Sequence, residues 1–296
     1  LFFQRQVPPY SGPDPDMVLE GEPGSFRGGF DFGNEQRSAI QTLDFNGDGY
    51  PDFLLKTYDP SVPTKAKLSL LYGGPLLDNE TDLEFTAIER GLSHHFAEDI
   101  LTGDLNGDGR DDILVYGTYS VDQRGRRYWE YFPGNNHGWT HSTRTLHSDS
   151  GWAPLHPKSN IMDVNHDGCD DIIDGGEHKD YGDALLFLGS DPLPQRLMPN
   201  DSIPNIRPYF GGDNEPGIAC PVGDMNGDGI RDLLIGWGVD FIRGTLYYLY
   251  PVTNWGLHKQ PLGAFGTIPD EDWVESGAYD AGDVTGDGFD DVIVPF

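Results

Sequence analysis

An acidic segment of nine residues occurs five times in this chain, and this repetition restricts the fold more than any other feature. The copies are DFNGDGYPD, DLNGDGRDD, DVNHDGCDD, DMNGDGIRD and DVTGDGFDD, and they begin at Asp44, Asp104, Asp163, Asp224 and Asp283. Their starts are 60, 59, 61 and 59 residues apart. A constant period of this length is typical of a repeat architecture in which each repeat forms one supersecondary unit.

Each acidic segment lies between two short apolar stretches. The following run is FLL, ILV, II, LLI or VIV, and alternating residues precede several copies. This pattern indicates a loop between two strands and not the start of a helix. Further strands are expected in LSLLYGGP, YWEYFPGN, ALLFLGS and LYYLYPV, and weaker fourth strands near 85–88, 140–146 and 264–268.

Four strands per repeat, arranged radially, make a β-propeller blade. We therefore expect an all-β, five-bladed β-propeller of four-stranded blades that forms a single domain over residues 1–296. The last repeat has only its first two strands, so the N-terminal segment, through 17–20 and 26–32, is expected to supply its outer strands and close the ring. Five repeats of a larger ring, or an open solenoid, are the alternatives.

The spacing within the acidic loops suits a hard cation. We number positions from the first aspartate of each loop; side-chain oxygens then stand at positions one, three, five and nine, and position seven offers its backbone carbonyl. Glycine at position six permits the sharp turn. Oxygen ligands favour Ca²⁺, because Zn²⁺ prefers nitrogen or sulfur and Mg²⁺ demands stricter octahedral geometry.

The EF-hand shares this spacing but requires a glutamate at position twelve, which none of the five loops has, and helices rather than strands flank it. A plain Asx-turn hairpin remains as the alternative. Up to five Ca²⁺ ions are predicted. The ligand positions are Asp44, Asn46, Asp48, Tyr50, Asp52, Asp104, Asn106, Asp108, Arg110, Asp112, Asp163, Asn165, Asp167, Cys169, Asp171, Asp224, Asn226, Asp228, Ile230, Asp232, Asp283, Thr285, Asp287, Phe289 and Asp291.

Two loops depart from the pattern. The third has His166 where the others have glycine. The fifth has Thr285 where the others have asparagine, and the threonine hydroxyl is the weaker oxygen donor. We expect weaker calcium binding at both.

At these residues the chain resembles the FG-GAP/VCBS repeats of integrin-α-type β-propellers. The segments GDLNGDGRDDILVYG at 103–117 and GDVTGDGFDDVIV at 282–294 carry the resemblance. It implies calcium loops in hairpins between the first two strands of a blade, and a secreted or cell-surface location. Because relatives of this kind include integrin heads, lectins and propeller domains of polysaccharide lyases, it leaves the function open.

Composition excludes some classes of partner. The chain has 49 acidic against 19 basic residues, for a net charge of −30. Such a charge repels nucleic acids and anionic lipid surfaces. No apolar run approaches the roughly 20 residues that cross a bilayer, so no transmembrane segment is expected.

Surface aromatics are the candidate ligand-binding residues. Tryptophans beside glycine, asparagine or aspartate are expected near loops, where exposed rings stack on sugars or anchor protein interfaces; packing between blades is the alternative. The tryptophans are Trp129, Trp139, Trp152, Trp237, Trp255 and Trp273. Cys169 and Cys220 form either one disulfide or two buried thiols.

The sequence has no recognisable nucleophile elbow, zinc-protease helix or phosphate-binding loop motif. It therefore gives no positive indication of an enzyme, and the question stays open. A local excess of histidine could supply a lyase or hydrolase base or a transition-metal ligand, or could lie on loops and strand surfaces. It comprises His94, His95, His137, His141, His147 and His156. We expect an extracellular calcium-binding module for a glycan or an extracellular protein. The alternatives are a structural subunit that self-associates, or a polysaccharide lyase or glycosidase.

Overall fold

The computed structural model is all-β. It describes residues 26–27, 40–58, 66–75, 78–86, 94–121, 124–135, 144–148, 159–174, 184–194, 196–197, 200–203, 216–238, 245–266 and 278–293. The described ranges hold strands and no helix, so none of their segments is a helix that could cross a membrane. The chain divides into two compact units, Leu1–Thr102 with Gly109–Thr145, and Gly103–Asp108 with Leu146–Phe296.

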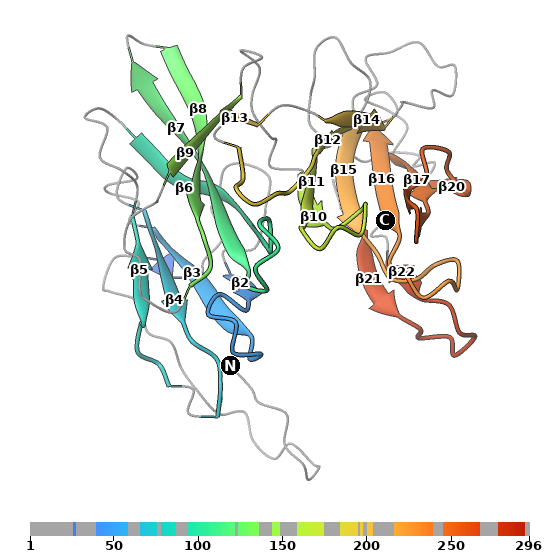
Figure 1. Cartoon of the computed structure of the whole chain (residues 1–296), viewed down its shortest axis with the longest axis horizontal. Coiled ribbons are helices and arrows are strands. Elements are labelled where there is room, and N and C mark those ends of the chain that lie inside the picture. Colours follow the sequence, from blue (N-terminus) through green and yellow to red (C-terminus); the bar gives the residue numbers. More distant parts are fainter. Residues whose placement is uncertain are drawn as a thin grey trace. The chain divides into compact units, whose positions relative to one another are not determined.

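The first repeat is an antiparallel sheet in the first unit (Figure 1). Its strands, in order, are β2 (Ile40–Leu43), β3 (Asp52–Tyr58), β4 (Lys67–Leu71) and β5 (Leu83–Phe85). Leu43 pairs with Asp52, so the acidic loop closes the β2–β3 hairpin.

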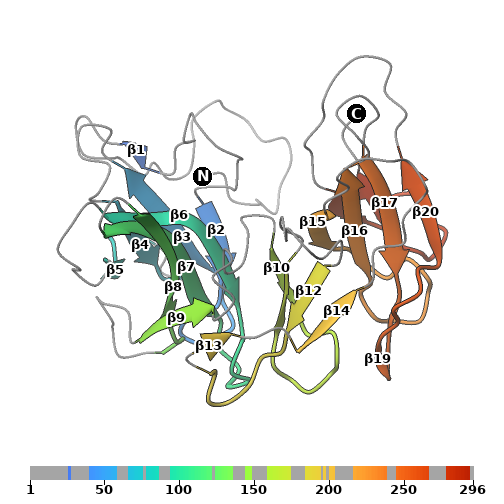
Figure 2. The same cartoon turned by 90° about the horizontal axis from the view of Figure 1, so that it is seen from above.

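The second repeat has the same succession of antiparallel strands (Figure 2). They are β6 (His94–Gly103), β7 (Asp112–Val121), β8 (Arg124–Phe132) and β9 (Arg144–Ser148). A short strand, β13 (Arg196–Leu197), pairs in parallel with the end of β9 at His147 and Ser148.

The second unit contains the remaining repeats. The third is β10 (Asn160–Met162), β11 (Asp171–Asp174), β12 (Ala184–Phe187) and β14 (Asp201–Ile203). The fourth is β15 (Pro216–Pro221), β16 (Leu233–Gly238), β17 (Thr245–Tyr250) and β20 (Gly263–Gly266), with a small hairpin of β18 (Val252–Thr253) and β19 (Gly256–Leu257). The fifth has two described strands, β21 (Tyr279–Gly282) and β22 (Asp291–Ile293).

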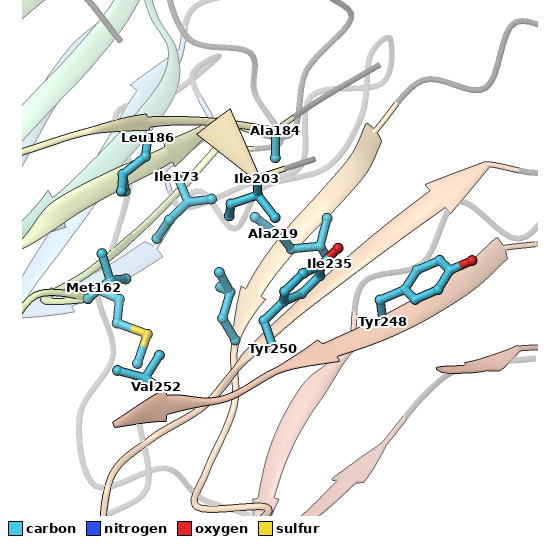
Figure 3. Packing of buried hydrophobic residues seen from close by; sticks show 12 residues of the cluster. Met162, Ile173, Ala184, Leu186, Ile203, Ala219, Ile235, Tyr248, Tyr250 and Val252 are labelled. Atoms are coloured by element: carbon cyan, nitrogen blue, oxygen red, sulfur yellow. The ribbon is translucent and has the colours of Figure 1, made fainter. Parts of the chain in front are cut away.

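Apolar cores join successive repeats inside each unit. In the first unit, Phe45, Phe85 and Phe132 pack edge-to-face, with ring centroids 5.5 and 5.0 Å apart. In the second unit, Ile173 and Ile203 of the third repeat lie opposite Ala219 and Ile235 of the fourth (Figure 3). These buried contacts supply the main stabilising term for the sheets.

The side chains of the second strand of a repeat alternate between the two faces of the sheet. Leu54, at position eleven of the first repeat, packs with Ile113 and Val115, at positions ten and twelve of the second. Leu234, at position eleven of the fourth, packs in one core with Val292, at position ten of the fifth. In these two cores, position eleven of one repeat lies with position ten of the following repeat.

The all-β class and the order of strands within repeats confirm the prediction from the sequence. The expected fourth strands correspond to β5, β9 and β20. The expectation for the N-terminal segment needs a correction at β1 (Phe26–Arg27), which pairs with Tyr58 and Thr57 of β3 in the first repeat and not with the fifth. Residues 17–20 and 28–32 lie outside the described residues.

Candidate metal centres

Each acidic loop winds around its first carboxylate. In the first loop, Asp44 Oδ1 accepts hydrogen bonds from the Gly47 and Asp48 amides at 2.9 and 3.1 Å, and Oδ2 accepts one from the Gly49 amide at 2.8 Å. The same three bonds in the fourth and fifth loops measure between 2.6 and 3.0 Å. Position one thus organises the turn through its own hydrogen bonds to the backbone.

Positions three and five continue this turn. Asn46 Oδ1 accepts from the Asp48 amide at 2.9 Å, and Asp48 Oδ1 accepts from the Tyr50 amide at 2.9 Å. The third loop repeats both bonds. A carboxylate or amide oxygen has two lone pairs, so these bonds leave acceptor capacity for a cation.

Glycine at position six is required by the backbone. Its φ is between +81° and +93° in all five loops, a left-handed conformation that disfavours side chains. His166, at position four of the third loop, holds the same kind of conformation, with φ of 61°. Its ring Nε2 lies 2.6 Å from the carbonyl oxygen of Thr253, so the ring reaches the β18–β19 hairpin.

Position nine is the most buried carboxylate of each loop. In the first four loops it is 0% exposed, as Asp52, Asp112, Asp171 and Asp232. Asp52 accepts from the amide of Phe45 at 2.9 Å and from that of Gly73, beyond β4, at 2.7 Å. The third and fourth loops make the equivalent pair of bonds. This carboxylate therefore ties the loop to the third strand of its own sheet.

Burial makes ionisation of these carboxylates costly. Burial, with a smaller contribution from the carboxylates at positions one and five, raises the pKa of Asp52 and of Asp232 to about 6 and that of Asp171 to about 7. The two backbone amides act in the opposite direction. A cation beside the loop would offset both the burial and the repulsion between like charges.

The donor types of each loop fit Ca²⁺. Among the described residues, no three Asp, Glu, His or Cys side chains are gathered in the manner of a metal site. A loop of this kind does not depend on three such groups alone, because its donors include an amide or hydroxyl oxygen and a backbone carbonyl. Calcium would be held by positions one, three, five and nine and by the carbonyl of position seven. Its binding to each loop stays a prediction.

Sequence reasoning missed position eight, which connects one loop to the previous one. Asp111 Oδ2 accepts from the Asp44 amide at 2.7 Å, while the Asp111 amide donates to the Asp44 carbonyl at 2.9 Å. Asp170 makes the same two bonds to Asp104, and Asp290 makes them to Asp224. We call this reciprocal pair of bonds the position-eight clasp.

Side chains at position seven cover the glycine at position four of the preceding loop. A Cβ on Gly47 would lie 2.9 Å from Arg110 Cγ, and one on Gly227 would lie 2.6 Å from Phe289 Cε1. In the same way, a Cβ on Gly107 would lie 2.9 Å from Cys169 Sγ. Glycine at position four thus accompanies the clasp at all three junctions.

The junction between the third and fourth repeats has neither feature. His166 occupies position four of the third loop, and Arg231 occupies position eight of the fourth. Here Asn160 Nδ2 donates to the Ala219 carbonyl at 2.7 Å, and His166 contacts Thr253. Sequence comparison of the five loops could have indicated this pairing of positions four and eight.

A family model described as FG-GAP repeat matches residues 96–128, which span β6, the second acidic loop, β7 and the start of β8. Integrin alpha-PS3 of Drosophila melanogaster is 26% identical over 225 residues, covering 67% of this chain. The chain therefore contains an FG-GAP repeat and is similar to an integrin α chain over two thirds of its length.

Other integrin α chains show a similar degree of likeness. Integrin alpha-6 of Homo sapiens is 26% identical over 231 residues, or 70% of this chain, and integrin alpha-X of Mus musculus is 27% identical over 158 residues, or 49%. The FG-GAP protein spans about a fifth of the length of these relatives, with 19% of alpha-PS3, 20% of alpha-6 and 13% of alpha-X covered.

The tryptophans of this FG-GAP protein fall into different environments. Trp129 is 0% exposed and packs on Tyr116 with ring centroids 5.3 Å apart, so the expected surface role is corrected to a core role. Trp255 is 94% exposed. Trp237 lies on β16 opposite Leu246, and its side chain is outside the described set, as are Trp139, Trp152 and Trp273.

Both cysteines are free thiols, so the disulfide considered from the sequence is not formed. Burial, followed by the carboxylates around it, raises the pKa of the Cys169 thiol. Among the histidines of the local excess, His94 and His95 lie on β6 and His147 lies on β9. The remaining three, His137, His141 and His156, lie outside the described residues.

Proposed function

We propose that this FG-GAP protein is an extracellular calcium-binding module of the β-propeller type that recognises a glycan or an extracellular protein in adhesion. Two findings support it. The acidic loops supply donors of the type that Ca²⁺ prefers, and the chain is related to integrin α chains.

Calcium has a structural role in this proposal. Each ion would hold a loop in the turn that its first carboxylate already organises, and would compensate the buried carboxylate at position nine. Up to five ions bind, with weaker binding at the third and fifth loops, where His166 and Thr285 depart from the pattern. Ligand binding then depends on calcium because the bound ions keep the loops ordered.

The observation that carries the recognition role is the exposed Trp255. It stands in the two-residue turn between β18 and β19, where its amide donates to Thr253 Oγ1 at 3.2 Å and Gly256 has a φ of +94°. A 94% exposed indole on an anchored turn offers a flat face to a sugar ring or an apolar side chain.

The third acidic loop contacts this hairpin at two points. His166 Nε2 lies 2.6 Å from the Thr253 carbonyl, and a Cβ on Gly256 would lie 3.3 Å from the Val164 carbonyl. Ordering of the third loop by calcium would therefore fix the position of Trp255.

A binding screen tests the proposal. The purified chain is applied to a glycan array and to immobilised extracellular proteins, with about 1 mM Ca²⁺ or with a chelator. We expect calcium-dependent binding to one ligand, which Trp255→Ala weakens by about tenfold or more. Leu262→Ala is the matched control, since Leu262 is also an exposed apolar residue, at 59%. Absence of binding by folded, calcium-loaded protein, or equal losses in both variants, would contradict the proposal.

A further inference from the structure

The fourth and fifth acidic loops are joined at residues that lie among their candidate calcium ligands. Both loops belong to the second compact unit. Asp290 Oδ2 accepts from the Asp224 amide at 2.7 Å, and the Asp290 amide donates to the Asp224 carbonyl at 3.0 Å. Asp224 is position one of the fourth loop, and Asp290 lies between Phe289 and Asp291, which are positions seven and nine of the fifth. This clasp therefore connects one candidate ligand of the fourth loop to two of the fifth.

The fifth loop contacts the fourth closely on both sides of Asp224. A Cβ on Gly223 would lie 2.2 Å from Asp290 Oδ2, and a Cβ on Gly227 would lie 2.6 Å from Phe289 Cε1. Glycine at these two positions lets the side chains of the fifth loop approach the backbone of the fourth. The first ligand of the fourth loop is thus placed against the fifth loop by hydrogen bonds and by packing.

The fifth loop itself is held by little packing. Residues 283–289 are all exposed, and Asp291 is partly exposed, whereas position nine of the first four loops is 0% exposed. Bonds inside the loop place its later positions, because Asp287 Oδ1 accepts from the Phe289 amide at 3.0 Å and Asp291 Oδ2 accepts from the Val284 amide at 2.9 Å. An ion held by these same groups would restrict them further and would fix the clasp in place.

The third loop contacts the fourth repeat in a different way. In the described part of the chain no clasp joins these two loops, because position eight of the fourth is Arg231, whose Nε donates to the Val222 carbonyl at 3.3 Å in its own repeat. The His166 ring lies 2.6 Å from the Thr253 carbonyl. The neighbouring amide of Val252 donates to position nine of the fourth loop at 3.0 Å. This route is indirect and does not include the backbone of position one.

We infer that calcium binds the fourth and fifth loops cooperatively, with the Asp290 clasp as the coupling element. The inference rests on the calcium binding of the proposed function and adds a regulation of it. An ion in the fifth loop orders Asp290 and Phe289, so the fourth loop loses less conformational entropy when it binds its own ion. Coupling of binding free energies is reciprocal, so an ion in the fourth loop strengthens binding at the fifth by the same factor.

Charge alone predicts a coupling of the opposite sign. Positions one, five and nine give the fifth loop three carboxylates, so a bound Ca²⁺ would change the local charge from −3 to −1. A less negative fifth loop attracts a cation to the fourth loop less strongly. At about 0.15 M ionic strength this effect is screened over about 8 Å. The sign of the measured coupling therefore distinguishes the clasp from simple electrostatics.

A calcium titration of the ¹⁵N-glycine-labelled chain, followed by NMR, measures the coupling. The Gly229 and Gly288 amides donate to the position-one carboxylates of the fourth and fifth loops, so each signal reports on its own loop. Asp287→Asn removes a ligand charge from the fifth loop and keeps the oxygen that accepts from Phe289. We expect it to weaken calcium binding at the fourth loop by about fivefold or more. Asp167→Asn, the matched change in the third loop, should alter that affinity by about twofold or less.

Two variants of the clasp separate this coupling from a general effect of the fifth loop. In an Asp290→Ala background, Asp287→Asn should change the affinity of the fourth loop by about twofold or less, because the connection is gone. In an Asp290→Asn background, which keeps an acceptor oxygen, most of the coupling should remain. The second background preserves the test if the alanine variant does not fold.

The outcomes distinguish this inference from the proposed function. If Asp287→Asn left the affinity of the fourth loop unchanged or increased it, the inference would be overturned, whereas calcium binding itself would stand. An equal loss with Asp167→Asn, or a full effect in the Asp290→Ala background, would overturn it as well. If neither loop of the folded parent bound calcium, the proposed function and this inference would fail together.

Discussion

At the scale of the residue, the aspartate at position nine has two opposing requirements. It is 0% exposed in four loops, and yet the calcium proposal requires it to be charged. Two backbone amides compensate only part of the cost, since the pKa of Asp171 remains at about 7 and that of Asp52 at about 6. If the proposal is right, a proton and a calcium ion compete for the same carboxylates.

This competition predicts opposite pH dependences with and without calcium. In chelator, the folded state binds more protons than the unfolded state between about pH 4 and pH 7, because its pKa values are raised. Stability from these groups is then present at low pH and lost as the pH rises through 6 to 7. With saturating calcium, stability should be lost as the pH falls through the same range.

Thermal unfolding between pH 5 and pH 8 measures this. We expect the melting temperature to fall by about 5 °C or more with rising pH in chelator and to rise in calcium. Equal slopes in the two conditions would show that the buried carboxylates are not calcium ligands.

At the scale of the element, loops that are distant in sequence hold each other through the position-eight clasp. Asp170 is 66 residues from Asp104, yet the two exchange a pair of bonds of 2.8 and 2.7 Å. The acidic loop is thus both a turn within one repeat and a connector between two.

Removing one clasp should cost measurable stability. Asp170→Ala leaves the Asp104 amide without this acceptor, and we expect a loss of about 1–3 kcal/mol in the free energy of unfolding, measured with urea in calcium. Asp170→Asn, which keeps an acceptor oxygen, should cost less. Arg231→Ala is the matched control at position eight, because its side chain is 60% exposed, and it should cost about 0.5 kcal/mol or less. If Arg231→Ala lowered the free energy of unfolding as much as Asp170→Ala, the clasp would not be a stabilising contact.

The sequence predicted what depends on local pattern. Apolar runs beside each loop located the hairpins, and glycine at position six located the turn, because both follow from the neighbouring residues. The clasp depends on a partner in another repeat, and the burial of Trp129 depends on which face of β8 its side chain takes. The β18–β19 hairpin has strands of two residues, too short for alternation to reveal.

At the scale of the whole molecule, the charge of −30 is partly a property of the loops. Positions one, five and nine contribute fifteen carboxylates, and five Ca²⁺ ions would reduce the net charge to about −20. Repulsion within the loops and between them should therefore decrease when calcium binds. The stability of the fold and the occupancy of the loops are linked by mass action.

Thermal unfolding with calcium, with magnesium and with chelator tests whether calcium ions hold the acidic loops in the folded state. A single site occupied at a hundred times its dissociation constant adds about 2.7 kcal/mol, so several sites should raise the melting temperature by about 10 °C or more in calcium. Magnesium at the same concentration should have a much smaller effect, because it dehydrates reluctantly and requires stricter geometry. A melting temperature that is the same in calcium and in chelator, or the same in magnesium and in calcium, would contradict the account.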